Sequence, residues 1–166
     1  MDKYFYLEIP GKPIPYSAHR DAAPQVYTIY SKAGVSRKTF SRKYNPRHKE
    51  KLEIQKTLKS QYLHALFDGP LIVRYLFRFP MPHNWVAVQK EKARQGLLHH
   101  TRKPDVSNLV KFYEDCMKGI VFTDDSLVTT FTPLKIYADV PMTQIWIRPY
   151  TAQELQDTIK EFLYAS

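Results

Sequence analysis

Carboxylates flank a short helical segment in the second half of the chain. Asp105 stands before the segment, and the pair Asp124 and Asp125 follows it. A helix over residues 107–118 is about 18 Å long, and the run from Gly119 to Asp125 covers roughly 20 Å when extended. The chain can therefore double back and bring Asp125 beside Asp105. Because carboxylate oxygens are common metal ligands, this spacing predicts a metal site.

The predicted helix separates apolar from polar side chains. The polar face carries Asn108, Lys111 and Asp115. Lys111 lies one turn into the helix and Asp115 one turn further, so both are expected near the carboxylates. Asn108 could orient a carboxylate, and Asp115 could either pair with Lys111 at i+4 or bind metal. The apolar residues recur at i, i+3, i+4, i+7 and i+8, as on a helix packed against a core; they are Leu109, Phe112, Tyr113, Cys116 and Met117.

The run KPDVSNLVKFYEDCMKGIVFTDDSLV, residues 103–128, resembles the signature of the RusA-type Holliday junction resolvases. That signature reads roughly PD-x-DN-L-x-K, then D, then G and D-D-x-x-V. The resemblance implies a small homodimeric endonuclease that uses Mg²⁺, with Mn²⁺ as an alternative, and cuts four-way DNA junctions. It also implies catalytic roles for Asp105, Lys111 and Asp125, with Asp105 and Asp125 holding metal. Asp124, the neighbour of Asp125, is a further candidate ligand.

One position departs from that signature, because Ser107 stands where the family has its second aspartate. Mg²⁺ keeps several waters and needs only one or two protein carboxylates, so Asp105 and Asp125 can suffice. A serine carries no charge, however, and a two-metal mechanism needs anions to hold two cations close together. Serine is also a favoured helix N-cap, which gives Ser107 a structural alternative.

Two functions follow from this departure. The first is an active resolvase, in which Asp115 or Asp124 supplies the missing charge. The second is a junction-binding protein that has lost cutting. A nuclease of the PD-(D/E)xK class would share Pro104 and Asp105, but no Asp-x-Lys or Glu-x-Lys follows downstream.

The charge of the chain agrees with a nucleic-acid partner. Lys and Arg total 25 against 16 Asp and Glu, which gives a formal net charge of +9. Residues 1–100 carry 18 basic and 7 acidic side chains, whereas residues 101–166 carry 7 and 9, so the acids gather where the metal is expected. Release of counterions from DNA would make binding depend strongly on salt.

Basic residues also lie just before the first carboxylate. His99, His100, Arg102 and Lys103 are predicted to contact phosphates beside the cut, because such groups position the DNA backbone without reading its sequence. The adjacent histidines lack the i, i+4 or CxxC spacing of ordinary zinc sites.

Length and composition indicate the setting. A chain of 166 residues suits one domain with a substantial core. The single cysteine, Cys116, cannot form an internal disulfide, which fits a reducing compartment. No apolar run approaches the ~18 residues that cross a membrane. We therefore expect a cytoplasmic protein without a membrane partner.

The patterning predicts one RusA-like α+β domain over residues 1–166, with a mixed sheet and helices packed mainly on one face. A basic hairpin is expected over 26–42 around a Lys-Ala-Gly turn, and residues 83–102 resemble an insertion of mixed helical propensity. Thr151 to Glu154 form a capping box that opens a final helix. The remaining elements are strands at 4–9, 71–79, 127–138 and 142–149, and a helix over 46–67 with an apolar face of Leu52, Ile54, Leu58, Tyr62 and Leu66.

Overall fold

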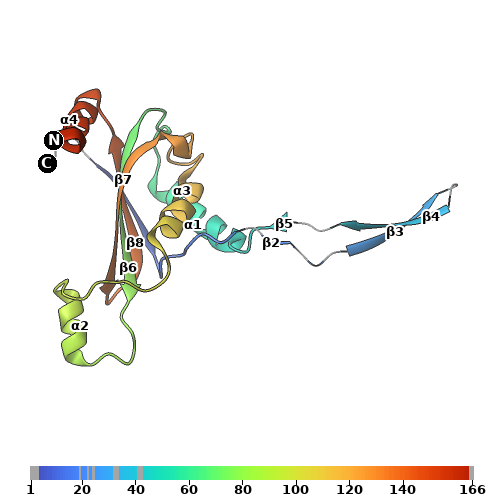
Figure 1. Ribbon diagram of the computed structural model, residues 1–166, viewed down its shortest axis with the longest axis horizontal. Helices are drawn as coiled ribbons and strands as arrows, with labels where there is room; N and C mark the ends of the chain where they lie inside the picture. Colours follow the sequence, from blue (N-terminus) through green and yellow to red (C-terminus); the bar gives the residue numbers. More distant parts are fainter. Residues whose placement is uncertain are drawn as a thin grey trace.

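A four-stranded mixed sheet forms the centre of the molecule, with strand order β1-β8-β6-β7 (Figure 1). The computed structural model describes residues 4–18, 20–21, 23, 25–31, 34–40 and 43–164. β1 and β6 pair antiparallel with β8, whereas β7 pairs parallel with β6. This sheet confirms the α+β prediction. Its strands are β1 (Phe5–Pro10), β6 (Leu71–Pro80), β7 (Val128–Ala138) and β8 (Met142–Pro149).

Strict alternation in β6 gives the sheet a buried face and an open one. Side chains at successive strand positions point to opposite faces. In β6 every second residue is buried beneath the helices, and the residues between them are on the other side. The buried row is Leu71, Val73, Tyr75, Phe77 and Phe79. The central strand expected at 71–79 is therefore confirmed, with the predicted periodicity.

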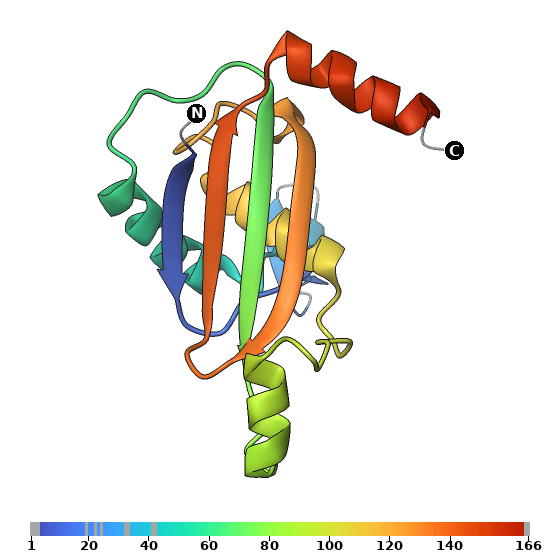
Figure 2. The ribbon, with the colours of Figure 1, turned by 90° about the vertical axis from the view of Figure 1, so that its left-hand side faces the viewer.

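Two helices cover the buried face, α1 (His48–Gln61) and α3 (Val106–Met117). Figure 2 shows the sheet from the other side, with both helices behind it. The whole apolar stripe predicted for α3 is buried, and Gly119 ends the run with φ of +74°. The helix begins and ends one residue earlier than predicted.

The helix expected over 46–67 is shorter, because it ends at Gln61. Tyr62 turns to an extended conformation and packs its ring against Phe5, with ring centroids 4.8 Å apart. Ile54, Leu58 and Tyr62 are buried as predicted, but Leu52 and Leu66 are exposed. Leu52 lies about 200° around the helix from Ile54, and Leu66 lies beyond the helix end.

A long hairpin projects from the helix-covered side of the molecule (Figure 1). It consists of β3 (Gln25–Ser31) and β4 (Gly34–Phe40), which we call the arm, and a short pair at its base, β2 (Arg20–Asp21) and β5 (Lys43–Tyr44). The predicted basic hairpin is confirmed. Residues 32–33 of the predicted turn lie outside the described residues.

Two further helices lie at the periphery. α2 (Ala87–Arg94) falls inside the insertion-like segment, and Arg94 forms two hydrogen bonds of 2.8 Å with Asp139. α4 (Ala152–Tyr164) opens with the predicted capping box: the Thr151 N–H donates to Glu154, and the Glu154 N–H donates to Thr151 Oγ1. Among the described helices, none is long and apolar enough to cross a membrane.

Candidate active site

Asp105 occupies the N-cap position of α3. Its backbone is extended, with φ of −71° and ψ of 145°, and its side chain forms no capping hydrogen bond. In the described part of the chain, no hydrogen bond or ion pair involves this exposed carboxylate. The predicted capping role of Ser107 is wrong, because the helix already begins at Val106. Ser107 is exposed in the first turn.

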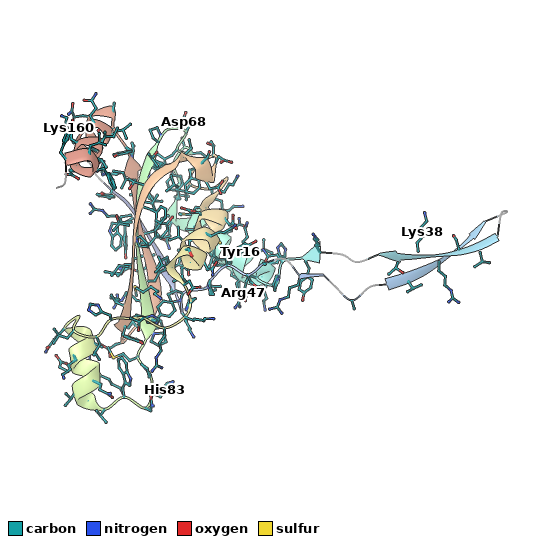
Figure 3. The ribbon with its side chains drawn as sticks, in the orientation of Figure 1. Tyr16, Lys38, Arg47, Asp68, His83 and Lys160 are labelled. Atoms are coloured by element: carbon teal, nitrogen blue, oxygen red, sulfur yellow. The ribbon has the colours of Figure 1, made fainter. Side chains whose placement is uncertain are left out.

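A cleft of about 660 Å³ opens beside the N-terminus of α3. Its walls come from the loop after β1, the start of α1 and the segment before α3. Figure 3 shows Tyr16 and Arg47 close to α3 at the base of the arm. Three cationic side chains, Lys12, Arg47 and Lys103, line this cleft together with the Asp105 carboxylate, and such cations suit a bound phosphate group. The lining residues are Lys12, Pro13, Ile14, Pro15, Tyr16, Arg47, Lys103, Pro104, Asp105 and Asn108.

Lys111 stands next to this cleft, held by an aromatic ring. Its ammonium lies 4.7 Å from the centroid of the Tyr16 ring, within the range of a cation–π interaction. The Tyr16 N–H donates to the Asn108 carbonyl at 2.7 Å, which fixes the loop against the helix. The predicted ion pair between Lys111 and Asp115 is not formed between these two described side chains. The Asn108 side chain lines the cleft, but it forms no hydrogen bond to a carboxylate among the described residues.

The acidic pair Asp124 and Asp125 lies at the other end of α3, beside Lys118. Asp124 caps the short 3₁₀ helix η1 (Asp125–Leu127) and accepts a hydrogen bond from the Ser126 N–H at 3.0 Å. The Lys118 ammonium lies 2.5 Å from Asp124 and 3.0 Å from Asp125. Because the segment is a turn and not a strand, both carboxylates reach one cation.

The electrostatics of this turn follow from that contact. Hydrogen bonding to Lys118 holds the pKa of the Asp124 carboxyl well below its usual range. The two carboxylates in turn raise the pKa of the Lys118 ammonium. Sequence reasoning missed Lys118, although its place just before the helix-ending Gly119 puts it beside the returning chain.

Glu114 is a second residue that sequence reasoning missed. It lies partly buried between α3 and the sheet, and burial raises its pKa to about 7, with further contributions from the negative charges of Asp125 and Asp115. The buried Tyr75 hydroxyl lies near Glu114 without reaching full hydrogen-bond geometry. In a helix, Glu114 lies two turns beyond Ser107 on the same face. The sequence therefore already placed this carboxyl on the face that carries the motif position of Ser107.

The structure thus divides the predicted residues between two ends of α3. Asp105, Asn108 and Lys103 line the cleft, whereas Asp124 and Asp125 meet Lys118. Within the described residues, no group of three or more His, Cys, Asp or Glu side chains is arranged to hold a metal ion. A cation shared by Asp105 and Asp125 stays a prediction.

Only part of the basic segment before Asp105 is exposed to solvent. His99, Arg102 and Lys103 are exposed, but His100 is buried between Phe79 and Tyr137, at ring distances of 4.4 and 4.5 Å. Burial lowers the pKa of His100 and favours its neutral form. The phosphate contact predicted for His100 is therefore not supported, because the ring packs inside the fold.

Lys135 organises the same segment from β7. Its ammonium donates to the carbonyls of Arg102 at 2.9 Å and Pro104 at 2.8 Å. Lys135 is a further residue that the sequence did not single out, since its partners are backbone atoms about 30 residues away.

Comparison with known proteins gives a family match and a relative. The family described as "Endodeoxyribonuclease RusA" matches residues 20–148, which include the arm, Asp105, α3 and the pair Asp124 and Asp125. "Uncharacterized protein YqaN" of Bacillus subtilis (strain 168) is 35% identical to this chain over 90 residues. That alignment covers 53% of this chain and 63% of the relative, so the chain spans less than two thirds of that protein.

Proposed function

Because the chain belongs to the RusA endodeoxyribonuclease family, we propose that it is a Mg²⁺-dependent, structure-selective endonuclease that resolves four-way DNA junctions in recombination and repair. One observation carries the proposal: the family motif is built around a single helix. Asp105 lies at the start of α3, Lys111 on its exposed side, and Asp125 in the turn that follows it. The cationic cleft beside Asp105 supports a phosphate-containing substrate.

Asp105, Asp124 and Asp125 are the residues that would hold the divalent cation. An all-oxygen donor set fits Mg²⁺ or Mn²⁺, and Asp124 and Asp125 already converge on one positive group, the Lys118 ammonium. When bound, the metal would supply Lewis-acid stabilisation of the phosphate and a more acidic water. Asp105 makes no hydrogen bond or ion pair with the described residues, so its carboxylate is free to bind metal, but Asp124 and Asp125 lie at the other end of α3.

The other residues act on the DNA itself. Lys12, Arg47 and Lys103 line the cleft and would bind the phosphates beside the cut through charge-assisted hydrogen bonds. Lys111, restrained over Tyr16, would offset negative charge that builds on the phosphate during attack. The role of Lys111 is electrostatic, because a protonated ammonium can donate hydrogen bonds but cannot accept a proton.

Paired cuts require two such sites. We infer a two-fold homodimer, in which equivalent sites face strands of like polarity in a four-way junction. This assembly comes from the family resemblance and from the symmetry of the substrate.

A second function is favoured by Ser107. This exposed residue brings no charge to the motif, and the described residues gather no trio of metal ligands. A protein that binds junctions through its basic cleft and has lost cutting would have the same fold. The two functions differ only in whether the bound junction is cut, so a cleavage assay distinguishes them.

Cleavage of a synthetic four-way junction and a matching linear duplex, with Mg²⁺ or Mn²⁺, tests the proposal. We expect paired cuts in the junction alone, and a loss of at least a hundredfold in Asp125→Asn with junction binding retained. Asp157→Asn, on the distant α4, is the matched carboxylate control. If wild type binds the junction without cutting and Ser107→Asp cuts it, the second function holds.

A further inference from the structure

The arm is the least supported part of the fold. β3 and β4 pair with each other over seven residues each, from Gln25–Phe40 at the base to Ser31–Gly34 near the tip. Figure 1 shows that they extend well beyond the helices and the sheet. A two-stranded hairpin on its own is at best marginally stable in water. The arm is about 23 Å long at ~3.3 Å per residue. We therefore expect a binding partner to stabilise it.

The charge of the arm points to a polyanionic partner. No acidic residue occurs between residues 22 and 49 of the sequence, whereas basic residues occur throughout that stretch. In the described part of the arm, Arg37 and Lys38 are exposed and form no ion pair. Lys38 stands clear of the ribbon, with no other element beside it (Figure 3). Such unneutralised cations gain free energy by releasing counterions from DNA phosphates.

The basic character continues from the arm to the cleft. Arg20 and Lys43 are exposed on the β2–β5 pair at the base, and Arg47 lies where that base meets α1 and the cleft. A DNA backbone that enters the cleft can therefore remain in contact with cations as it leaves along the arm.

Arg37 and Lys38 are neighbours in β4, so their side chains lie on opposite faces of the ribbon. Arg37 shares its face with Val26 and Val35, and Lys38 lies on the other face with Ser36. A ribbon that lay flat on one duplex would use only one of these faces. A ribbon between two duplexes would use both.

We propose that the arm lies between two duplex arms of a branched DNA, with Arg37 contacting phosphates of one duplex and Lys38 contacting phosphates of the other. This inference rests on the proposed function and adds a source of structure selectivity outside the catalytic motif. It assigns the preference for branched over linear DNA partly to an element that takes no part in the chemistry.

A second copy of the chain is a weaker candidate for the same partner. The chain carries a formal net charge of +9, so a basic arm approaching another copy meets charge of the same sign. DNA phosphates offer opposite charge at every base step.

The test is binding without cutting, by fluorescence anisotropy in EDTA over a range of KCl concentrations. A four-way junction and a linear duplex are compared for wild type and for Arg37→Gln/Lys38→Gln. We expect junction affinity to fall roughly tenfold or more and the salt slope, d log K/d log[salt], to fall in magnitude by about two. For the duplex the slope should fall by only about one, since one face of the ribbon is used.

Lys92→Gln/Lys160→Gln is the matched control, because it removes the same charge from α2 and α4, away from the arm. This control should bind both DNAs within about twofold of wild type. Equal losses on junction and duplex, or no loss on either, would overturn the inference. If wild type itself does not prefer the junction, the proposed function fails and not the arm alone.

A shortened arm gives an independent measurement that does not depend on two side chains. Replacing residues 27–38 by Asn-Gly joins the paired residues Val26 and Thr39 through a two-residue turn. We expect junction binding to weaken at least as much as in the double variant, with the mass by light scattering unchanged. A changed mass with junction affinity retained would show that the arm contacts a second copy, which contradicts the proposal.

Discussion

The Lys118 ammonium lies between Asp124 and Asp125, two of the carboxylates that the proposed metal site would use. Its ammonium is 2.5 and 3.0 Å from the two carboxylates, so metal must displace it to bind both. In the proposed metal site, this internal cation would therefore compete with the external one. Such competition limits metal affinity without changing any of the ligands.

Lys118→Gln should bind Mn²⁺ more tightly than wild type, by several-fold, because the competing charge is removed. Isothermal titration calorimetry of the protein without DNA measures this directly. Lys160→Gln, which loses a lysine from a surface pair with Asp157, serves as the control. Unchanged or weaker Mn²⁺ binding in Lys118→Gln would mean that Asp124 and Asp125 are not the metal ligands.

Glu114 should give folding stability a distinct pH dependence. Burial raises its pKa from the usual 4.5 to about 7, so the folded state binds the proton more tightly than the unfolded state does. The free energy of unfolding then decreases as pH rises from about 4.5 to about 7. Glu114→Gln should be more stable than wild type above pH 7, by on the order of 1 kcal/mol after allowing for partial exposure.

Thermal unfolding between pH 4 and pH 8 checks this expectation. The two proteins should converge below pH 4.5, where Glu114 is protonated in both the folded and the unfolded states. Glu161→Gln, on the exposed side of α4, should follow wild type throughout. Parallel curves for Glu114→Gln and wild type would show that this carboxyl is not perturbed.

At the scale of elements, β7 holds the loop that leads into α3. Lys135→Met keeps the length of the side chain but removes both hydrogen bonds to the carbonyls of Arg102 and Pro104. Loss of such charged hydrogen bonds costs about 1–3 kcal/mol each. Hydrogen exchange in residues 101–105 should quicken, and junction cleavage should weaken.

Lys92→Met is the matched control, since Lys92 is exposed on α2 and has no such partners in the described structure. Exchange at 101–105 that stays as slow as in wild type would contradict the role of Lys135. A loss of exchange protection over the whole sheet would instead show a general effect on folding.

Elements with strong periodicity were predictable from the sequence, and those set by distant contacts were not. The alternation of β6 and the apolar stripe of α3 each determine one buried face on their own. The end of α1 depends on Tyr62 packing against Phe5, a contact across more than 50 residues that propensity does not show. The hairpin was predictable as strands, but its projection from the body was not.

In the candidate site, too, the local motif was predictable from the sequence, whereas the contacts between distant residues were not. The family motif located Asp105, Lys111 and the acidic turn, and these residues do lie along α3 and the turn after it. The partners of the turn, Lys118 and Glu114, depend on where the returning chain lies against the helix. The burial of His100 depends on rings from β6 and β7, so local charge pattern alone predicted a surface residue.

At the scale of the whole molecule, the candidate active site and the arm lie on the helix-covered side of the sheet, and the other face of the sheet remains open (Figures 1 and 2). We expect a dimer in solution, because paired cutting needs two sites. Multi-angle light scattering should give the mass of two chains at micromolar concentration. A single-chain mass, both free and bound to a junction, would contradict paired cutting by one assembly.

Cys116 gives this molecule a practical property. It is the one cysteine of the sequence, it is completely buried, and burial raises its pKa to about 12, so it stays unreactive toward maleimides at neutral pH. A cysteine introduced at the exposed Ser36 could thus be labelled selectively with one fluorophore per chain. Energy transfer from that dye to one on each duplex arm would follow the approach of the hairpin to DNA in real time.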